Sequence, residues 1–313
     1  NLRVAATAPP DLEHLRAATR QGTAEAWRAY ANALVVWGGV GQLGDAIAAY
    51  ERALTLEPEH GPTYFRLGVA YRLRYDSDYG QPADFQQAVA HWGKALATDP
   101  NQYIWRRRIQ QYGPRLNKPY PFYDWVRTAR KEIVARGETP AALWVEPGGA
   151  EFAHPAKSFV VSEVRRAEPG LPARIFRDEQ GRIYRDERGF IKVEKTVVPA
   201  AIAPGASARA HVVFRPNLRI KAHWNNEVDG LVFWINPPEG WQVDSRYLTV
   251  PNAPQAVSQE SRKVEFELRC PQNASPGPVT IPAYALYYVC EDVNGTCLYR
   301  RQDVNLQVKV RKP

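Results

Sequence analysis

The sequence predicts a chain of two parts, with helical hairpins in the first half and an antiparallel β-sandwich in the second. Three observations support this multidomain fold class. Apolar residues recur at helical spacing in the first 137 residues, a string of residues repeats there, and apolar and polar residues alternate after Pro140. The length of 313 residues also fits about two domains, since a domain averages roughly 150 residues.

The composition fits a folded protein and argues against several function classes. Hydrophobic residues make up 44% of the chain, which is enough to form cores. The net charge is +8, but 33 acidic residues are interspersed with 41 basic ones, so a nucleic-acid-binding surface is not expected. The sequence contains no apolar run of about 18 residues that would span a membrane. It begins at Asn1 and contains no Met, so we expect a removed leader or a piece of a longer protein.

A repeat marks the helical half. Small, aromatic and proline residues recur 42 positions later, so that Ala46, Tyr50, Ala53 and Pro58 return as Ala88, Trp92, Ala95 and Pro100. Small residues at this spacing let two helices approach closely, an aromatic side chain fills the groove, and proline ends the second helix. The pattern resembles the tetratricopeptide repeat, and the resemblance covers residues 23–100.

The first helices of the two repeats also match that family. The matching positions are Tyr64, Leu67, Gly68 and Tyr71 and, less closely, Tyr30, Leu34 and Trp37. The family's period is about 34 residues, so we expect the additional residues to form an inserted loop at 73–82. The resemblance implies a concave surface that binds a protein partner, but a spacer packed on its neighbour fits the same pattern.

We assign residues 1–137 to this helical domain, with capping helices on both sides of the repeats. The arginine triplet at 106–108 is expected on a solvated helix face or against an acidic partner, and His91 is expected to pack rather than to bind a ligand. A last helix is predicted at 124–136, with an Asp N-cap and Gly137 as its stop. An aromatic group expected to pack between the two halves consists of Tyr120, Phe122, Tyr123 and Trp125.

Residues 138–189 are predicted to form a connector with a β-hairpin. A charged hairpin is expected at 175–195, with turns at 178–181 and 186–189. Its acidic residues could suggest a calcium loop, but arginines interleave with them, and Ca²⁺ requires a concentrated cage of oxygen atoms. A solvated hairpin is therefore expected. Two further strand candidates lie at 142–145 and 158–161.

The domain at 190–313 contains strand-like segments separated by turn signals. These segments lie at 193–198, 208–214, 218–224, 231–235, 263–269, 279–288 and 304–310. Seven strands in about 120 residues favour an antiparallel immunoglobulin-like β-sandwich. His223 and Glu227 lie close in sequence, but no second His or Cys stands at metal-ligand spacing. We therefore expect no metal site and place Trp224 in the sandwich core.

The functional prediction depends on two cysteines near the end of the chain. A strand-like aromatic run ends in Cys290, and Cys297 opens a second run. A four-residue loop would place Cys290 opposite Cys297, within the roughly 4.4–6.8 Å between Cα atoms that a disulfide needs. A two-residue Asn294-Gly295 turn would instead pair Cys297 with Asp292. We favour the longer loop and hence the disulfide.

The motifs of residues 190–313 resemble those of the N-terminal, immunoglobulin-like periplasmic domain of the thiol-disulfide interchange protein DsbD and its relatives. They are Lys-Ala-His-Trp-Asn-Asn-Glu at 221–227, Pro-Glu-Gly-Trp at 238–241, Ala-Ser-Pro-Gly at 274–277, Tyr-Tyr-Val-Cys at 287–290 and Cys-Leu-Tyr at 297–299. In that family a cysteine pair, capped by a loop, passes electrons from the membrane part to exported thiol proteins. The resemblance implies redox chemistry at Cys290 and Cys297, a cap within 247–257, and a periplasmic or otherwise exported location.

This sequence departs from the family in two respects. Six residues separate the cysteines, more than is usual in the family, and the family's transmembrane and thioredoxin-like parts have no counterpart here. Glu291 and Asp292 also follow Cys290, and negative charge disfavours a thiolate. Cys270 is expected to be a buried free thiol.

Two functions fit these observations, and whether the protein is an enzyme stays open. The first is an exported protein-interaction module with a redox-capable disulfide, which exchanges with or docks a thioredoxin-like or redoxin partner. The second is a non-catalytic scaffold subunit of a larger exported or membrane-associated assembly, with a structural disulfide. No cofactor is expected, because the sequence lacks a phosphate-binding loop and a haem-attachment motif.

Overall fold

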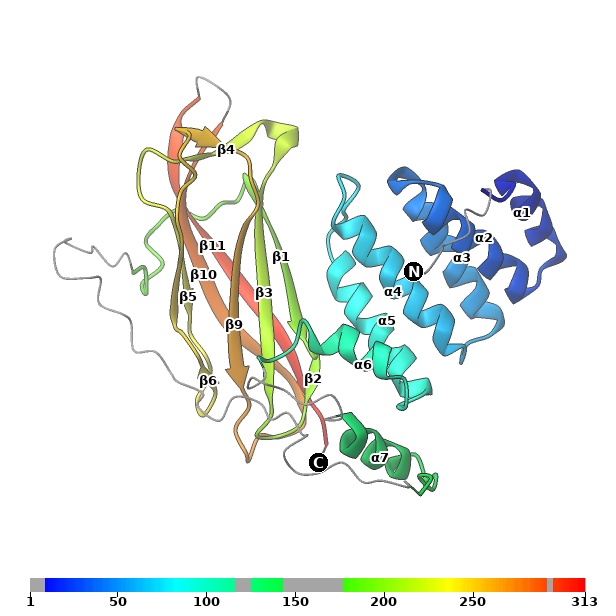
Figure 1. Cartoon of the computed structure of the whole chain (residues 1–313). Coiled ribbons are helices and arrows are strands. Elements are labelled where there is room, and N and C mark those ends of the chain that lie inside the picture. Colours follow the sequence, from blue (N-terminus) through cyan, green and yellow to red (C-terminus); the bar gives the residue numbers. More distant parts are fainter. Residues whose placement is uncertain (1–8, 116–124, 143–176, 292–294, 313) are drawn as a thin grey trace, which may run out of the picture. The chain divides into compact units, whose positions relative to one another are not determined.

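The computed structural model describes residues 9–115, 125–142, 177–291 and 295–312. Helices occupy the first half and strands the second, which confirms the predicted fold class (Figure 1). The chain divides into two compact units, Asn1–Gln111 with Pro119–Ala153 and Tyr112–Lys118 with His154–Pro313. The first unit is helical, and the second is built on β-sheets.

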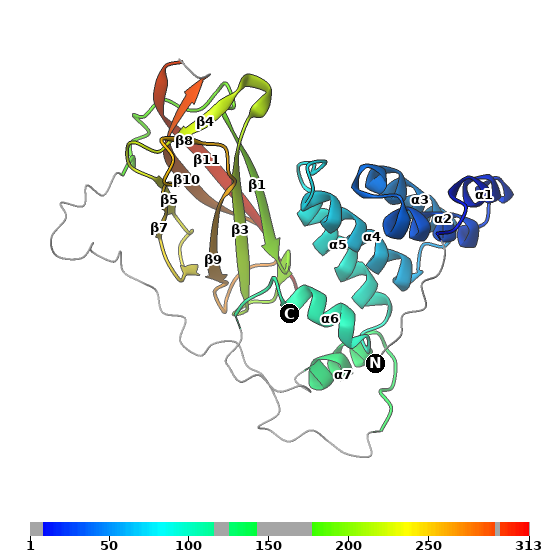
Figure 2. The ribbon, with the colours of Figure 1, turned by 45° about the horizontal axis from the view of Figure 1, so that its top comes forward.

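From α1 to α6 of the helical unit, each helix packs against the next along the chain (Figures 1 and 2). Side-chain caps begin the first two helices, because Asp11 accepts hydrogen bonds from two N–H groups of α1 and Thr23 accepts one in α2. The described helices are α1 (Leu12–Ala18), α2 (Ala24–Trp37), α3 (Leu43–Leu56), α4 (Gly61–Tyr75), α5 (Asp84–Thr98), α6 (Tyr103–Gln110) and α7 (Trp125–Ala135), with 3-10 turns η1 (Thr19–Gln21) and η2 (Val40–Gln42).

The repeated residues form the interior of the helical unit. The side chains at most 2% exposed include Ala46, Tyr50 and Ala53 of α3 and Ala88, Trp92 and Ala95 of α5. Gly68 of α4 lies directly against Trp92. A Cβ atom at Gly68 would lie 2.5 Å from the Trp92 ring and 2.9 Å from the Ala88 carbonyl oxygen, so only glycine permits this close approach of α4 and α5.

The inserted loop is shorter than predicted. Residues 73–75 belong to α4, and the turn follows at 76–83. The reason is a partly buried ion pair that closes the turn, in which the Arg74 guanidinium donates to Asp84 at 2.6 Å. Helix α4 therefore continues to Tyr75, which places Arg74 within reach of Asp84.

The prediction of a solvated arginine triplet is wrong for Arg106, which is only 5% exposed. Its guanidinium donates to Glu132 at 2.6 Å and to the Pro100 carbonyl at 2.9 Å, so acceptors inside the helical unit satisfy its charge. Gly137 ends the last helix with a φ of 79°, as predicted. The rest of the aromatic group before Trp125, together with Asp124, lies outside the described residues.

His91 packs against two tyrosine rings, as the sequence predicts. Its ring stacks on Tyr64 and Tyr71 with centroid distances of 5.9 and 5.5 Å. Burial, with a smaller effect of nearby Lys94, lowers the pKa of His91 to about 4. His91 is therefore a neutral ring at physiological pH and contributes to helix packing.

The described residues of the second unit form two sheets. The order of the four-stranded sheet is β1-β3-β9-β6, and that of the seven-stranded sheet is β2-β11-β10-β4-β8, with β5 pairing with β10 and β7. The pairs are antiparallel except β2 with β11, which is parallel. The strands are β1 (Ile191–Val198), β2 (Ala201–Ile202), β3 (Ser207–Pro216), β4 (Ala222–Asn225), β5 (Leu231–Ile235), β6 (Gln242–Val243), β7 (Tyr247–Val250), β8 (Val257–Ser258), β9 (Arg262–Arg269), β10 (Gly277–Glu291) and β11 (Cys297–Val310).

One hydrophobic cluster joins the two sheets. Its aromatic members include Phe214 and Phe266 of the smaller sheet and Trp224, Phe233 and Tyr287 of the larger one. Trp224 and Tyr287 meet edge to face at 5.6 Å, a favourable aromatic geometry. Trp224 therefore lies in the sandwich core, as predicted from the sequence.

The segment at 218–224 was predicted as one strand, and this is wrong for its first half. A 3-10 turn, η4 (Leu218–Ile220), precedes β4. Asn217 caps this turn with its side-chain oxygen, and Lys221 then adopts a positive φ of 53°. The strand can begin only after that residue.

The segment at 177–191 is not the solvated hairpin predicted from its charges. Asp178 and Asp186 are 4% and 9% exposed, and each accepts two backbone N–H groups that follow it. Asp186 also accepts from the Tyr287 hydroxyl at 2.8 Å, and Asp178 pairs with Arg301 at 3.1 Å. The two aspartates therefore anchor this segment to the larger sheet. The strand candidates at 142–145 and 158–161 fall, apart from Ala142, outside the described residues.

Candidate functional site

Cys290 and Cys297 form a disulfide at the end of the long β10–β11 hairpin. They are directly paired in the ladder, and their Cα atoms lie 4.0 Å apart. This register is the one predicted from a longer loop, and it excludes the pairing of Cys297 with Asp292 that a two-residue turn would produce. The disulfide thus joins two strands already held together by a continuous antiparallel ladder.

The two cysteines differ sharply in exposure. Cys290 is 2% exposed, whereas Cys297 is an exposed residue at the first position of β11. Thiol–disulfide exchange begins when a thiolate attacks one sulfur of a disulfide, and the accessible sulfur is favoured. The arrangement therefore presents Cys297 to an external thiol and leaves Cys290 as the thiolate that would be released.

The disulfide lies on the outer face of the larger sheet. Tyr287 and Val289 point into the sandwich core, so alternation places Tyr288 and Cys290 on the opposite face. The next rung on that face is an aromatic pair, in which the rings of Tyr288 and Tyr299 have centroids 4.5 Å apart. An aromatic surface thus adjoins the exposed end of the disulfide.

His223 of β4 extends the row of side chains on this rung. The ladder pairs Cys290 with Cys297 on β11 at one side and with His223 on β4 at the other. Residues paired in this way project on the same face, with Cβ atoms about 4.5–5.5 Å apart. His223 is 9% exposed, and its Nδ1 lies 3.3 Å from the Lys221 carbonyl oxygen.

Other polar residues near His223 have structural partners. The Trp224 indole donates to the Glu260 carbonyl at 2.8 Å, and Asn226 accepts from Arg262 at 2.5 Å. Within the described part of the chain, no group of three or more His, Cys, Asp or Glu residues could hold a metal ion.

The acidic residue beside Cys290 is neutralised by a partner that the sequence did not predict. Glu291 accepts two hydrogen bonds from the Arg188 guanidinium, at 2.6 and 2.8 Å. The same interaction raises the pKa of Arg188. The local negative charge expected to disfavour a thiolate is therefore offset, while Asp292 lies outside the described residues.

Cys270 is a buried free cysteine, as predicted from the sequence. Burial raises the pKa of its thiol, and a hydrogen bond from the Gly205 backbone opposes this only in part. A buried, protonated thiol is a poor nucleophile. The segment 247–257, expected to contain a cap, pairs through β7 with β5 and through β8 with β4.

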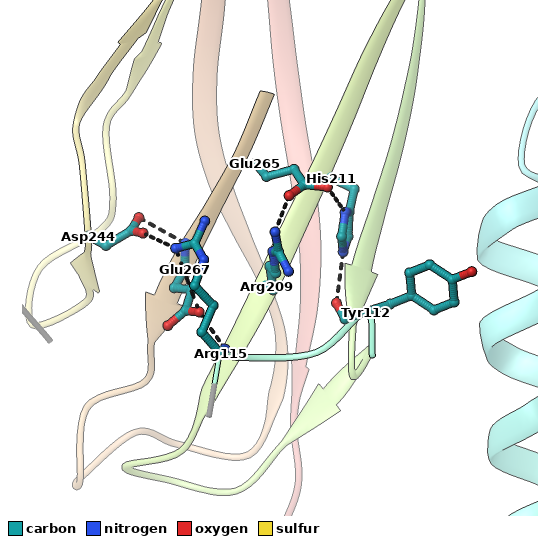
Figure 3. A network of polar contacts seen from close by, with 7 residues as sticks. All are labelled: Tyr112, Arg115, Arg209, His211, Asp244, Glu265 and Glu267. Carbon is teal, nitrogen blue, oxygen red and sulfur yellow. Dashed lines mark hydrogen bonds and ion pairs between the residues drawn. The ribbon is translucent and has the colours of Figure 1, made fainter. Parts of the chain in front are cut away.

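A second polar cluster lies on the outer face of the four-stranded sheet, where residues 112–115 cross β3 and β9 (Figure 3). The His211 ring contacts the Tyr112 carbonyl oxygen through Nε2 at 2.8 Å and Glu265 through Nδ1 at 2.9 Å. A carbonyl and a carboxylate only accept hydrogen bonds, so the ring has an acceptor at each of its two nitrogens. Arg209 also pairs with Glu265.

Arg115 ties the same segment to the sheet at a second point (Figure 3). Its backbone N–H donates to Glu267 at 2.6 Å, and its guanidinium donates to Asp244 at 3.2 Å. The Glu267 N–H in turn donates to Asp244 at 2.8 Å. The sequence did not predict this cluster, because its members lie in four separate segments. The only signal was the alternation that places His211 and Glu265 on polar strand faces.

The helical unit offers a candidate interaction surface. On α2, Asn32 accepts hydrogen bonds from the Tyr50 hydroxyl at 2.7 Å and from Arg66 at 3.1 Å, which holds a polar group at the helix surface. Large apolar side chains lie exposed where α2 ends, with Val36 at 65%, Trp37 at 44% and Val40 at 55%. Exposed apolar groups of this kind are common where a partner binds.

Comparison with known proteins identifies no family. No protein-family model matches the sequence, and no curated protein matches it. Similar solved structures include MamA, at 19% identity with a TM-score of 0.25, where the match covers 40% of this chain and 57% of MamA. Another is the bacterial hydrophobin BslA, at 14% identity with a TM-score of 0.22, covering 39% of this chain and 99% of BslA.

A third similar structure is the alkylpurine DNA glycosylase AlkC of Pseudomonas fluorescens, at 10% identity with a TM-score of 0.20, covering 98% of this chain and 84% of AlkC. The chain spans little more than half of the MamA length. All these TM-scores are below 0.5, so none of these similarities indicates a function for this chain. Among the described helices, none is long and apolar enough to cross a membrane.

Proposed function

We propose that this protein is an exported protein-interaction module whose Cys290–Cys297 disulfide undergoes reversible exchange with the dithiol of a partner protein. The observation that carries the proposal is the unequal exposure of the pair, with Cys297 exposed and Cys290 2% exposed. A disulfide that serves only as a staple has no need to offer one sulfur to solvent. A thioredoxin-like or redoxin protein has the dithiol that the reaction requires.

The exchange proceeds in two balanced steps. A partner thiolate attacks Sγ of Cys297, a new intermolecular S–S bond forms, and the Cys290–Cys297 bond breaks with release of the Cys290 thiolate. The second partner thiolate then attacks the partner's own sulfur and releases Cys297. The partner dithiol is oxidised to a disulfide, and the cysteine pair is reduced to two thiols. The reverse sequence oxidises the pair.

The surroundings of the pair support exchange rather than stapling. The loop closed by the disulfide is short, so its entropic contribution to stability is about 2.5 kcal/mol, at the low end for a disulfide. The β10–β11 ladder already holds the strands in register. Glu291 is paired with Arg188, so it does not leave an uncompensated negative charge beside Cys290.

The exported location and the likeness to the DsbD periplasmic domain belong to this proposal. Support for both comes from a disulfide on a hairpin in a chain of only three cysteines, because disulfides persist in oxidising compartments. The helical stack would hold the partner. Its exposed Val36, Trp37 and Val40 also favour the second candidate, a non-catalytic scaffold subunit with a structural disulfide.

The reduction potential of the Cys290–Cys297 pair distinguishes the two candidates. The folded Cys270→Ala variant is equilibrated in glutathione and dithiothreitol buffers, thiols are alkylated, and the oxidised fraction is measured by mass spectrometry. A redox pair is expected to titrate between about −270 and −120 mV, whereas a structural disulfide titrates below about −300 mV. A pair that stays oxidised until the protein unfolds would contradict the exchange function and support the second candidate, a scaffold subunit with a structural disulfide.

A further inference from the structure

His223 lies beside Cys290, the residue whose sulfur the proposed exchange would release. It is paired with Cys290 in the β4–β10 ladder, so the two side chains share one face and one rung. Cys297 is one strand further away, at a Cα distance from His223 of about 9–10 Å, since strands are about 4.8 Å apart. Any direct proton transfer to the ring therefore concerns Cys290 rather than Cys297.

The chemistry of exchange creates a need for a proton carrier at this position. Cys290 is 2% exposed, so bulk water has little access to it. Burial in apolar surroundings disfavours the charged form of a thiol, and a thiolate released there is costly unless it is protonated or paired with a cation. In the reverse direction a buried thiol must lose its proton before it can attack.

The hydrogen bond of His223 selects a tautomer suited to this task. Nδ1 lies 3.3 Å from the Lys221 carbonyl oxygen, which can only accept, so Nδ1 carries the hydrogen. In the neutral ring Nε2 then holds the lone pair and can take up a proton. An imidazole held in this way accepts a proton at Nε2 and returns it from the same atom.

The charged neighbours leave the ring free to change charge. The charged residue nearest to His223 along the chain is Lys221, which precedes β4 and is exposed. On β10 the residue after Cys290 is Glu291, which forms an ion pair with Arg188. Glu291 is paired with Ala222 in the ladder, so it does not share a face with the His223 ring. Beyond β4, the Gln259 side chain donates to the Ala222 carbonyl at 3.3 Å and is uncharged.

We propose that His223 is the acid–base residue of the exchange, giving a proton to Cys290 when its thiolate is released and taking it back when Cys290 attacks. This inference rests on the proposed function. In the reductive direction, the protonated ring converts the released Cys290 thiolate to a thiol and becomes neutral. In the oxidative direction, neutral Nε2 removes the thiol proton, and the Cys290 thiolate attacks Cys297 within the mixed disulfide.

The proposal can be tested with dithiobis(nitrobenzoate), Ellman's reagent, as the disulfide probe. The reduced Cys270→Ala protein reacts at exposed Cys297 and releases one thionitrobenzoate; Cys290 then attacks Cys297 and expels the second. The two releases are followed separately by stopped-flow absorbance from pH 5 to 9. His223→Gln is expected to slow the second release about tenfold at pH 7, because few ordinary thiols are ionised at that pH. The first release should be unchanged.

The pH profile separates acid–base chemistry from a general structural effect. The second release should depend on pH differently in His223→Gln, because the contribution of the ring is lost and the rate approaches that of the unsubstituted protein only at high pH. The control is His14→Gln, at an exposed position of α1, which should leave both releases unchanged. A second release with the same rate and pH profile in His223→Gln would overturn the role of His223.

Failure of the proposed function gives a different result. If the protein with both cysteines and His223 shows no second release, Cys290 does not exchange with Cys297, and the relay itself is ruled out. Should His223→Gln fail to fold, nuclear magnetic resonance of the intact protein provides the second test. The titration of the His223 ring is expected to shift when the disulfide is reduced, and an unchanged titration would overturn the proposal.

Discussion

The sandwich carries two buried histidines on its two outer faces, and they are held in opposite ways. His211, on the four-stranded sheet, has an acceptor at each ring nitrogen, the Tyr112 carbonyl and the Glu265 carboxylate (Figure 3). His223, on the seven-stranded sheet, has a carbonyl at Nδ1 and shares a rung with Cys290. The first ring has an acceptor at each nitrogen, whereas the second has one only at Nδ1 among the contacts described.

This difference shows that the neighbours of a histidine decide its role. The two residues have nearly equal exposure, with His211 at 6% and His223 at 9%, so burial does not distinguish them. A ring between two acceptors links segments of the fold. A ring with one acceptor beside a disulfide can support chemistry. Substitution of each ring, and of the Glu265 carboxylate, tests this comparison.

The largest effect on stability is expected from His211→Leu. Leucine removes the donors of two hydrogen bonds and leaves Glu265 and the Tyr112 carbonyl without them. The expected loss in the free energy of unfolding is about 1–3 kcal/mol, less than for a fully buried pair because Glu265 is 40% exposed. Urea unfolding at pH 7 measures the loss. An unchanged midpoint would show that the Tyr112–Arg115 cluster does not stabilise the sandwich.

A smaller effect is expected from acid titration of the same cluster. Burial raises the pKa of Glu265, but the charges and hydrogen bonds of His211 and Arg209 outweigh it, and the net pKa is lowered. A carboxylate with a lowered pKa stabilises the fold above its unfolded-state pKa of about 4.3, and this contribution is lost as the pH falls through the lowered value. Glu265→Gln should therefore reduce the loss of stability between pH 5 and pH 3.

Urea unfolding at several acidic pH values tests this dependence. The matched control is Glu13→Gln, at an exposed position of α1, which should keep the pH dependence of the unsubstituted protein. Equal slopes for Glu265→Gln and the unsubstituted protein would show that the carboxylate gains nothing from its two cationic neighbours.

The smallest effect on stability is expected from His223→Leu. The change removes a single 3.3 Å hydrogen bond to the Lys221 carbonyl, so the free energy of unfolding should fall by less than about 1 kcal/mol. Exchange at the disulfide should nevertheless slow as it does in His223→Gln. A loss of stability as large as that of His211→Leu would remove the contrast between the two rings.

Short-range patterns predicted the local elements well. The repeat of small and aromatic residues predicted the packing of α3, α4 and α5, and the cysteine spacing predicted the register at the end of β10 and β11. Gly137, predicted as the stop of the last helix, follows from the same local chemistry. Each of these signals lies within a window of about one repeat or one hairpin, where spacing alone determines which residues meet.

Polar partners could not be predicted in this way. Arg106 was expected on a solvated face or against an acidic partner, and it is buried against Glu132 of its own helical unit. Asp178 and Asp186 were expected in a solvated hairpin and accept backbone N–H groups instead. A buried charged side chain needs a partner, but the sequence contains many residues of the opposite charge that could be that partner. Only the packing of distant segments selects one of them.

The amino-acid sequence by itself determined the order of helices before strands, the close approach of the repeated helices, and the meeting of Cys290 with Cys297. The tertiary structure alone decided that His223 lies beside Cys290, that His211 lies between two acceptors, and that Arg188 neutralises Glu291. The physical reason is the range of the interactions. Periodicity and turn chemistry act between near neighbours, whereas the pairing of strands brings together residues about 70 positions apart, such as His223 and Cys290.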